Sequence, residues 1–240
     1  MRVWLIVLLA GCGRFAFDPG SDGGATPDVS LPSDLVLYYP MDEIAPGNSL
    51  EDKTPYGHLA VCWITCPPLE PGIKGMALHL DGVQDYVEVL PAPDIDALTT
   101  YTVAFWARVD AQTNAAGCMI GKVFGTADAN SFQICMTMAT QQVFTSGWDG
   151  AMNDDFYVGY YLDASWHHLA ITYDGTLERL YTDGAFWKMR VRPLYFDTHE
   201  LVIGTDYDNS APFAHFGGWL DDVRIYNRAL APAEIMALAQ

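Results

Sequence analysis

The chain contains few basic residues. Only 12 of its 240 residues are Lys or Arg, against 30 Asp and Glu, so the formal net charge at pH 7 is −18. A surface field of this sign repels nucleic acid and anionic lipid, and it favours solubility, cations and neutral ligands such as glycans. We therefore expect no role in nucleic-acid binding.

The sequence also lacks a later hydrophobic run that approaches the ~20 apolar residues needed to cross a membrane. Residues 1–10 form a shorter apolar start with one early base, which is typical of an export signal. The segment from Leu9 to Cys12 resembles the lipobox of bacterial lipoproteins. The resemblance implies an exported protein that loses residues 1–11 and is held at the membrane only by acyl chains on Cys12. Gly13 in place of Asp favours the outer membrane, by analogy with lipoprotein sorting.

Residues 12–33 are rich in Gly, Pro, Ser and Asp and show almost no apolar periodicity. This composition predicts a flexible tether, with a root-mean-square span of roughly 25 Å for about 20 residues. The folded domain is then expected at 34–240, a length that suits one large β-sandwich.

Four cysteines remain in the expected folded domain: Cys62, Cys66, Cys118 and Cys135. An even number in an exported chain predicts two disulfides, and four cysteines allow three pairings. We favour Cys62 with Cys66 and Cys118 with Cys135, because the second pair lies on strands that can be neighbours in a meander. A zinc site of four thiolates is the rival, but C-x3-C with a widely split second pair in an oxidising compartment argues against it.

Short runs rich in β-branched and aromatic residues alternate with turn residues from position 35 onward. They predict roughly a dozen strands, at 35–39, 76–80, 86–89, 101–109, 119–123, 132–138, 142–146, 156–161, 166–173, 179–182, 201–203 and 219–226. Asp-Gly pairs at 81, 174 and 183 are typical of tight turns and favour antiparallel pairing. Helical spacing is confined to 232–239. The predicted fold class is therefore all-β, a two-sheet antiparallel jelly-roll sandwich with a short C-terminal helix.

Four segments in this order carry a family resemblance. They are GMALHLDG with DYVEV within 75–89, YTVAFW at 101–106, WHHLAITYDG with LYTDG within 166–184, and GWLDDVRIYNRAL at 218–230. Together they resemble the laminin-G-like, concanavalin A-like lectin/glucanase jelly-roll family over residues 34–240. The resemblance implies a concave sheet, adhesive or carbohydrate-binding activity and, in some members, a structural calcium ion.

The acidic pattern of glucanases with this fold is missing. Those enzymes carry acids at alternate positions of one strand, as in Glu-x-Asp-x-x-Glu, because retaining hydrolysis needs two carboxylates about 5 Å apart. A Gly-x-Ser-x-Gly elbow and a Gly-rich phosphate loop are also missing. We therefore predict no enzymatic activity, and a degenerate glycoside hydrolase is the less favoured alternative.

Three aspartates are candidate calcium ligands: Asp42, Asp52 and Asp221. By strand alternation Asp221 shares a face with Val223 and Ile225, which predicts a partly buried carboxylate that needs donors or a cation. Hard oxygen ligands suit calcium. Asp42 and Asp52 join Asp221 if the first and last strands lie side by side, as they do in the family that the chain resembles. The alternative is a hydrogen-bonded structural aspartate.

Aromatic and polar side chains crowd residues 148–161. Flat rings stack on sugar faces, while acids and amides bind hydroxyl groups. The candidate ligand-binding residues are therefore Trp148, Asp149, Asn153 and Tyr157. The sequence predicts a non-catalytic recognition or adhesion module with a glycan as its first expected partner. A structural lipoprotein that contacts a cell-surface protein is the alternative.

Overall fold

The computed structural model describes residues 31–110, 117–125, 129–137, 140–193, 195–208 and 211–240. The predicted signal peptide, Cys12 and nearly all of the predicted tether lie outside these residues. In the described part of the chain, no helix is long and apolar enough to cross a membrane.

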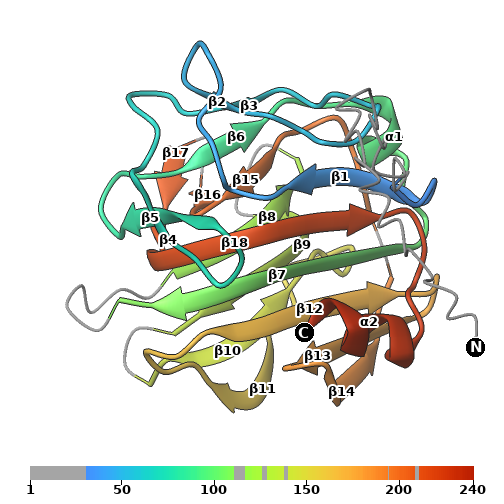
Figure 1. Cartoon of the computed structure of the whole chain (residues 1–240). Coiled ribbons are helices and arrows are strands. Elements are labelled where there is room, and N and C mark those ends of the chain that lie inside the picture. Colours follow the sequence, from blue (N-terminus) through green and yellow to red (C-terminus); the bar gives the residue numbers. More distant parts are fainter. Residues whose placement is uncertain (1–30, 111–116, 126–128, 138–139, 194, 209–210) are drawn as a thin grey trace, which may run out of the picture. The chain divides into compact units, whose positions relative to one another are not determined.

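Two antiparallel sheets form the folded part of the chain (Figure 1). The strands of the first sheet are β1 (Leu35–Tyr39), β4 (Leu69–Pro71), β5 (Met76–Asp81), β7 (Tyr101–Val109), β12 (His167–Tyr173), β13 (Leu177–Thr182), β14 (Ala185–Val191) and β18 (Gly217–Tyr226). They follow the order β14-β13-β12-β7-β18-β5-β4, and β1 also pairs with β18. The first and last strands of this sheet along the chain are therefore neighbours, as expected.

The second sheet follows the order β11-β10-β9-β8-β15-β6-β3-β2. Its strands are β2 (Ser49–Leu50), β3 (Ala60–Val61), β6 (Val87–Val89), β8 (Gly117–Val123), β9 (Asn130–Met136), β10 (Gln142–Ser146), β11 (Phe156–Tyr161) and β15 (Leu201–Ile203). A separate hairpin consists of β16 (Asp206–Asp208) and β17 (Ala211–Phe213). The prediction of an all-β, two-sheet antiparallel sandwich is confirmed.

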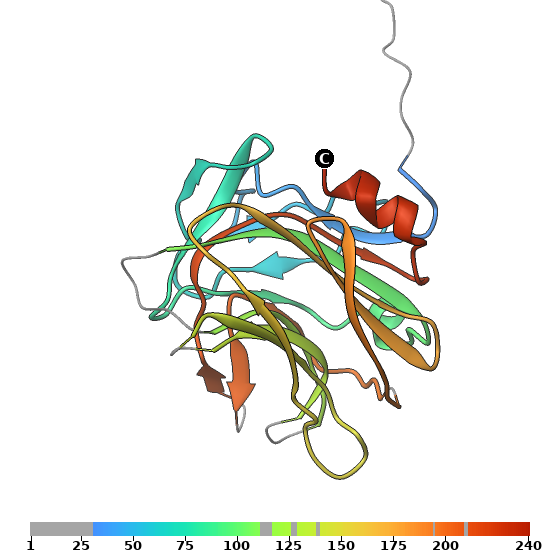
Figure 2. The ribbon, with the colours of Figure 1, turned by 90° about the horizontal axis from the view of Figure 1, so that it is seen from below.

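The core between the sheets is built by alternation along the strands. On β7, Val103, Phe105 and Ala107 belong to the main buried cluster, while Ala104 points to the opposite face of the sheet. There it packs with Ile235 of helix α2 (Pro232–Leu238), which lies on the outer side of the first sheet (Figure 2). A second short helix, α1 (Pro93–Asp96), follows β6.

The Asp-Gly pairs form the tight turns that the sequence predicts. After β5, Oδ1 of Asp81 accepts hydrogen bonds from the backbone N–H groups of Val83, Gln84 and Asp85. Gly82 supplies the positive φ of 72° that this turn requires. The carboxylate thus satisfies three donors that the turn removes from the ladder.

Both disulfides are present in the pairing favoured from the sequence. Cys62–Cys66 closes the loop that follows β3. Cys118–Cys135 joins β8 to β9, where the two cysteines are direct partners in the antiparallel ladder.

Candidate functional site

The outer face of β9, β10 and β11 presents a row of rings. Phe132 and Ile134 of β9 lie in the core, so the intervening and following residues, Gln133 and Cys135, face outward. Cys135 is opposite Phe144 of β10, which is opposite Tyr157 of β11. The rings of Phe144 and Tyr157 have centroids 5.3 Å apart, and 48% of Tyr157 is exposed.

Trp148, Asp149 and Asn153 lie together in the loop between β10 and β11. Trp148 and Asn153 form an isolated antiparallel bridge, and the half-buried ring of Trp148 stacks on Phe124 with centroids 6.3 Å apart. Trp148 lies beyond the end of β10, in the loop that leads to β11, and its ring contacts Phe124, which follows β8.

Two of the polar candidates have structural tasks. Oδ1 of Asp149 accepts hydrogen bonds from the N–H groups of Met152 and Ala151, and these bonds hold its pKa below the usual value. Oδ1 of Asn153 accepts from the backbone N–H of Asn130 at 3.1 Å. Both side chains thus fix the loop that presents Trp148.

Polar groups on the floor of this face include atoms that have no partner among the described residues. Oγ of Ser146 and Oδ1 of Asn130 are buried and accept or donate no hydrogen bond there. Gln133 lies opposite Ser146, and its Oε1 is 3.4 Å from Sγ of Cys118. A sulfur in a disulfide has no proton to donate, so this is a contact, and Gln133 is almost fully buried beneath the face.

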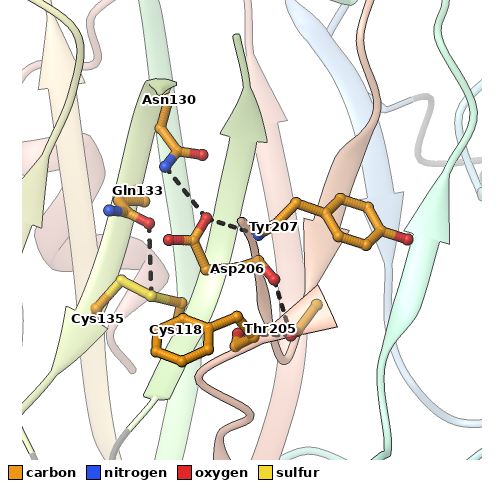
Figure 3. Close-up of a disulfide and its surroundings, with 8 residues drawn as sticks. Cys118, Asn130, Gln133, Cys135, Thr205, Asp206 and Tyr207 are labelled. Carbon is orange, nitrogen blue, oxygen red and sulfur yellow. Dashed lines mark hydrogen bonds between the residues drawn. A yellow bond between two sulfur atoms is a disulfide. The ribbon is translucent and has the colours of Figure 1, made fainter. Parts of the chain in front are cut away.

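The β16–β17 hairpin crosses the outer face beside these residues (Figure 3). Oδ1 of Asp206 accepts from Nδ2 of Asn130 at 3.1 Å and from the backbone N–H of Tyr207 at 2.8 Å. Oγ1 of Thr205 donates to the carbonyl of Phe213 at 2.8 Å. β16 packs on β8, the bond from Asn130 to Asp206 reaches β9, and every residue of β8 and β9 is buried.

On the other side of the hairpin lies an aromatic group that the sequence analysis missed. Nε1 of Trp63 and the hydroxyl of Tyr207 both donate to Oε2 of Glu88, at 2.6 and 2.9 Å. Trp63 is 61% exposed and stands in the loop closed by Cys62–Cys66. A tryptophan inside a C-x3-C loop is a signal that could have singled it out, because a short bridged loop cannot bury a large ring.

Asp221 is buried, but it does not lie on the core-facing side of β18 that strand alternation predicts. Asp221 pairs with Trp106, and the register of β18 against β7 shifts before Arg224 pairs with Ala104. Asp222, with φ of 56°, lies in this bulge. Leu220 and Val223 therefore point into the core while Asp221 points to the outer face, so the expectation that Asp221 shares a face with Val223 is wrong.

The carboxylate of Asp221 is covered by the turn between β4 and β5. Its Oδ2 accepts from the N–H groups of Ile73 and Lys74, while Oδ1 is buried without a partner among the described residues. Burial, and the neighbouring charges of Asp222 and Asp42, raise its pKa to about 7, although the two backbone bonds act in the opposite direction.

Asp42 reaches the same turn, but Asp52 does not take part. Oδ1 of Asp42 accepts from the N–H of Met76 at 2.8 Å. Asp52 instead accepts from backbone N–H groups of Tyr38, Thr54 and His58, and its Oδ2 lies 2.7 Å from Nδ1 of His58. Within the described residues no group of three or more His, Cys, Asp or Glu side chains could hold a metal ion. The predicted three-aspartate set is thereby reduced to Asp42 and Asp221.

A surface cavity of about 420 Å³ opens elsewhere, between Tyr173, Thr176 and Arg192. The guanidinium of Arg192 donates to Glu178 and to the carbonyls of Ser131 and Ser146. The cavity therefore offers little charge to a ligand, and the aromatic face of β9–β11 is the better candidate.

The fold defines an antiparallel two-sheet β-sandwich. Residues 81–236 match the model of the concanavalin A-like lectin/glucanases superfamily, and the chain belongs to that superfamily. The superfamily includes glucanases as well as binding domains, so membership alone does not decide catalysis.

Solved structures show the same fold. The binding domain of Paraclostridial Mosquitocidal Protein 1 has 14% identity and a TM-score of 0.67, and the match covers 86% of this chain and 52% of that one. Domain 4 of AbnA, a GH43 extracellular arabinanase from Geobacillus stearothermophilus solved with arabinotriose, has 20% identity and a TM-score of 0.66, with 86% and 98% covered. The botulinum neurotoxin serotype D binding domain has 14% identity and a TM-score of 0.65, with 86% and 51% covered.

The chain thus spans about half of each toxin domain and nearly all of the arabinanase domain. No curated protein matches the chain. At these identities the likeness shows the fold alone; two of the three structures are binding domains and the third holds arabinotriose.

Proposed function

We propose that this domain is a non-catalytic recognition module that binds a neutral oligosaccharide on the outer face of β10 and β11. The observation that carries the proposal is the exposed ring of Tyr157 beside Phe144, with Trp148 in the loop that follows β10. Rings of this kind stack on the apolar faces of sugars. The arabinotriose complex of the AbnA domain supports this ligand class.

The acidic charge of the chain supports a neutral ligand, because it repels uronic and sialic acids. Catalysis is not part of the proposal. Asp149 and Asp206, the carboxylates described beside this face, accept hydrogen bonds from backbone or amide donors. Release of reducing ends from a polysaccharide by the purified chain would contradict this assignment.

Isothermal titration of the full chain with arabinotriose and with other linear neutral oligosaccharides from a glycan array tests the proposal. We expect Tyr157→Ala to weaken binding about tenfold, or ~1.4 kcal/mol. Trp148→Ala should also weaken it. Phe186→Ala is the matched control, because it removes an exposed ring from β14 of the other sheet. Absence of sugar binding, or an unchanged affinity in Tyr157→Ala, would exclude the face.

We further propose that Asp42 and Asp221 hold a structural calcium ion at the β4–β5 turn. The unpartnered Oδ1 of Asp221 is a hard oxygen ligand in need of a cation, and Gly72 and Gly75 let the two carboxylates approach the turn without a clash. The ion would neutralise the buried charge and tie β18 to the turn.

The N-terminal sequence supports a third proposal, that the protein is an exported bacterial lipoprotein anchored through Cys12, most simply in the outer membrane. Incorporation of labelled palmitate into the wild type, and its loss in Cys12→Ser, is the expected result. Equal labelling of both proteins would contradict it.

A further inference from the structure

An apolar surface covers the outer face of β3 and β6. Its residues, which we call the Trp63 surface, are Leu59, Val61, Trp63, Ile64, Glu88 and Leu90. Ala60 and Val89 point into the core, so their neighbours Leu59, Val61, Glu88 and Leu90 point outward. The N–H of Leu90 donates to the carbonyl of Leu59, which continues the ladder by one more pair.

Large apolar side chains are well exposed on this surface. Leu59 is 51% exposed, Trp63 61% and Ile64 68%. Single exposed apolar residues are common, but several on adjacent positions form a patch that is typical of an interaction site.

The loop that carries Trp63 is held in place at several points. The Cys62–Cys66 bridge closes it, the N–H of Cys62 donates to the carbonyl of Asn48, and Nδ2 of Asn48 donates to the carbonyl of Ile64. The hydrogen bond from Trp63 Nε1 to Glu88 fixes the indole itself. A ring ordered before binding loses little conformational entropy when a partner arrives.

Glu88 places a negative charge inside this apolar surface. Its Oε2 accepts from both Trp63 and Tyr207, while Oε1 accepts no hydrogen bond from any residue in the described ranges. A carboxylate held at the edge of an exposed indole is a recognition site for a cation, through charge pairing. The net charge of −18 adds a long-range field of the same sign.

We infer that the Trp63 surface docks a protein partner that presents a Lys or Arg side chain among apolar residues. The indole and Ile64 bury the apolar part, and Oε1 of Glu88 accepts from the cation. Tryptophan at the centre of an apolar patch is the residue type that most often carries binding energy at protein interfaces. A sugar would use the indole but has no use for Leu59 and Ile64.

This surface is separate from the proposed glycan face. In the strand order, β15 and β8 lie between β6 and β9, and the β16–β17 hairpin packs on β8. Asp206 of the hairpin contacts Asn130 on one side, and Tyr207 contacts Glu88 on the other. The inference therefore does not depend on sugar binding.

The probes are short synthetic peptides with one Lys or Arg between Leu and Val residues, and the same peptides with norleucine or Glu in its place. Binding to the full chain is measured by fluorescence anisotropy at two salt concentrations. We expect the basic peptides to bind about tenfold more tightly than the norleucine peptides, with a loss of affinity at high salt. Trp63→Ala and Glu88→Gln should each weaken the binding of the basic peptides about tenfold. Glu88→Gln should have a smaller effect on the binding of the norleucine peptides.

Ile64→Ser tests the surface without touching the Glu88 bond, in case Trp63→Ala disturbs the loop. Phe186→Ala and Tyr157→Ala are controls and should leave peptide binding unchanged, and far-UV circular dichroism verifies the fold of each variant. Equal affinity for basic and norleucine peptides, or no effect of Glu88→Gln, overturns the inference. Loss of sugar binding in Trp63→Ala also overturns it, because Trp63 would then belong to a glycan site.

Discussion

Nη1 of Arg192 donates a 2.8 Å hydrogen bond to Oε2 of Glu178, and both side chains are almost fully buried. The other oxygen of Glu178 accepts from Nε of Arg190 and from the hydroxyl of Thr145. Thr145 lies on β10 of the second sheet and Glu178 on β13 of the first. The carboxylate therefore joins the two sheets at the edge next to the proposed glycan face.

We predict that Glu178→Ala lowers the free energy of unfolding by about 3–5 kcal/mol, because it leaves the buried guanidinium of Arg192 without its counter-charge. Urea denaturation measures the loss. Arg179→Gln on the same strand is the control, since it removes an exposed ion pair with Asp174 and should cost less than about 1 kcal/mol. Equal losses in the two variants would show that Glu178 has no special role.

His168 should contribute stability that rises between pH 4 and pH 6.5, whereas Asp221, with its pKa raised to about 7, contributes with the opposite sign over the same range. Burial lowers the pKa of this imidazole to about 4, and the positive charges of Lys74 and Arg224 act in the same direction, while Asp183 and Asp222 oppose them. Between these pH values the imidazole is protonated in the unfolded chain and neutral in the folded chain, so this group alone favours folding by about 3 kcal/mol as the pH rises.

Urea denaturation as a function of pH tests this expectation for His168. His168→Gln should remove the rising contribution, so that the stability of the variant relative to the wild type falls as the pH increases from 4 to 6.5, because the amide does not titrate. His167→Gln on the preceding, more exposed position is the matched control and should retain the slope. The same pH dependence in His168→Gln and in the wild type would assign the effect to other groups.

The strands with regular alternation were predictable from the sequence, and those that depend on distant contacts were not. Val103, Phe105 and Ala107 alternate with outward residues, and periodicity alone identifies β7. The short strands β2, β3 and β16 are too brief to show a period.

The features of the sites that the sequence did not predict depend on an irregular strand pairing and on contacts between residues far apart in the chain. The face of Asp221 follows from a one-residue bulge at Asp222, which inverts the parity that strand alternation predicts. The setting of Trp63 depends on Glu88 and Tyr207, and Glu88 and Tyr207 are 119 positions apart along the chain. Local patterns carry no information about contacts of this range.

Calcium should stabilise the domain through Asp221. At a calcium concentration about a hundred times the Kd, we expect the Tm to rise by roughly 5–10 °C, and a chelator should reverse the rise. Asp221→Asn should abolish the response and leave the calcium-free protein equally or more stable, because it removes a buried charge with an unpartnered oxygen.

Differential scanning calorimetry with and without calcium measures both effects of Asp221→Asn. Asp174→Asn, at an exposed turn, is the control and should respond to calcium as the wild type does. A Tm that does not depend on calcium in the wild type would exclude the ion.

The two disulfides should contribute unequally to stability. In the chain-entropy description a cross-link stabilises in proportion to the logarithm of the loop it closes, and the sequence separations are 17 for Cys118–Cys135 and 4 for Cys62–Cys66. Replacing both cysteines of a pair with Ala should therefore cost about 3 kcal/mol for the longer loop and about 2 kcal/mol for the shorter one. Urea denaturation of the two double variants measures the difference.

The shorter bridge should matter more for binding than for folding, because it constrains the loop that carries Trp63. Opening Cys62–Cys66 frees that loop before a partner arrives, and ordering it again reduces the affinity for basic peptides. The variant that lacks the Cys118–Cys135 bridge should keep that affinity as long as the domain remains folded, because this bridge lies on the other side of the β16–β17 hairpin. Unchanged peptide binding after loss of Cys62–Cys66 would mean that the bond from Trp63 to Glu88 is sufficient to hold the indole in place.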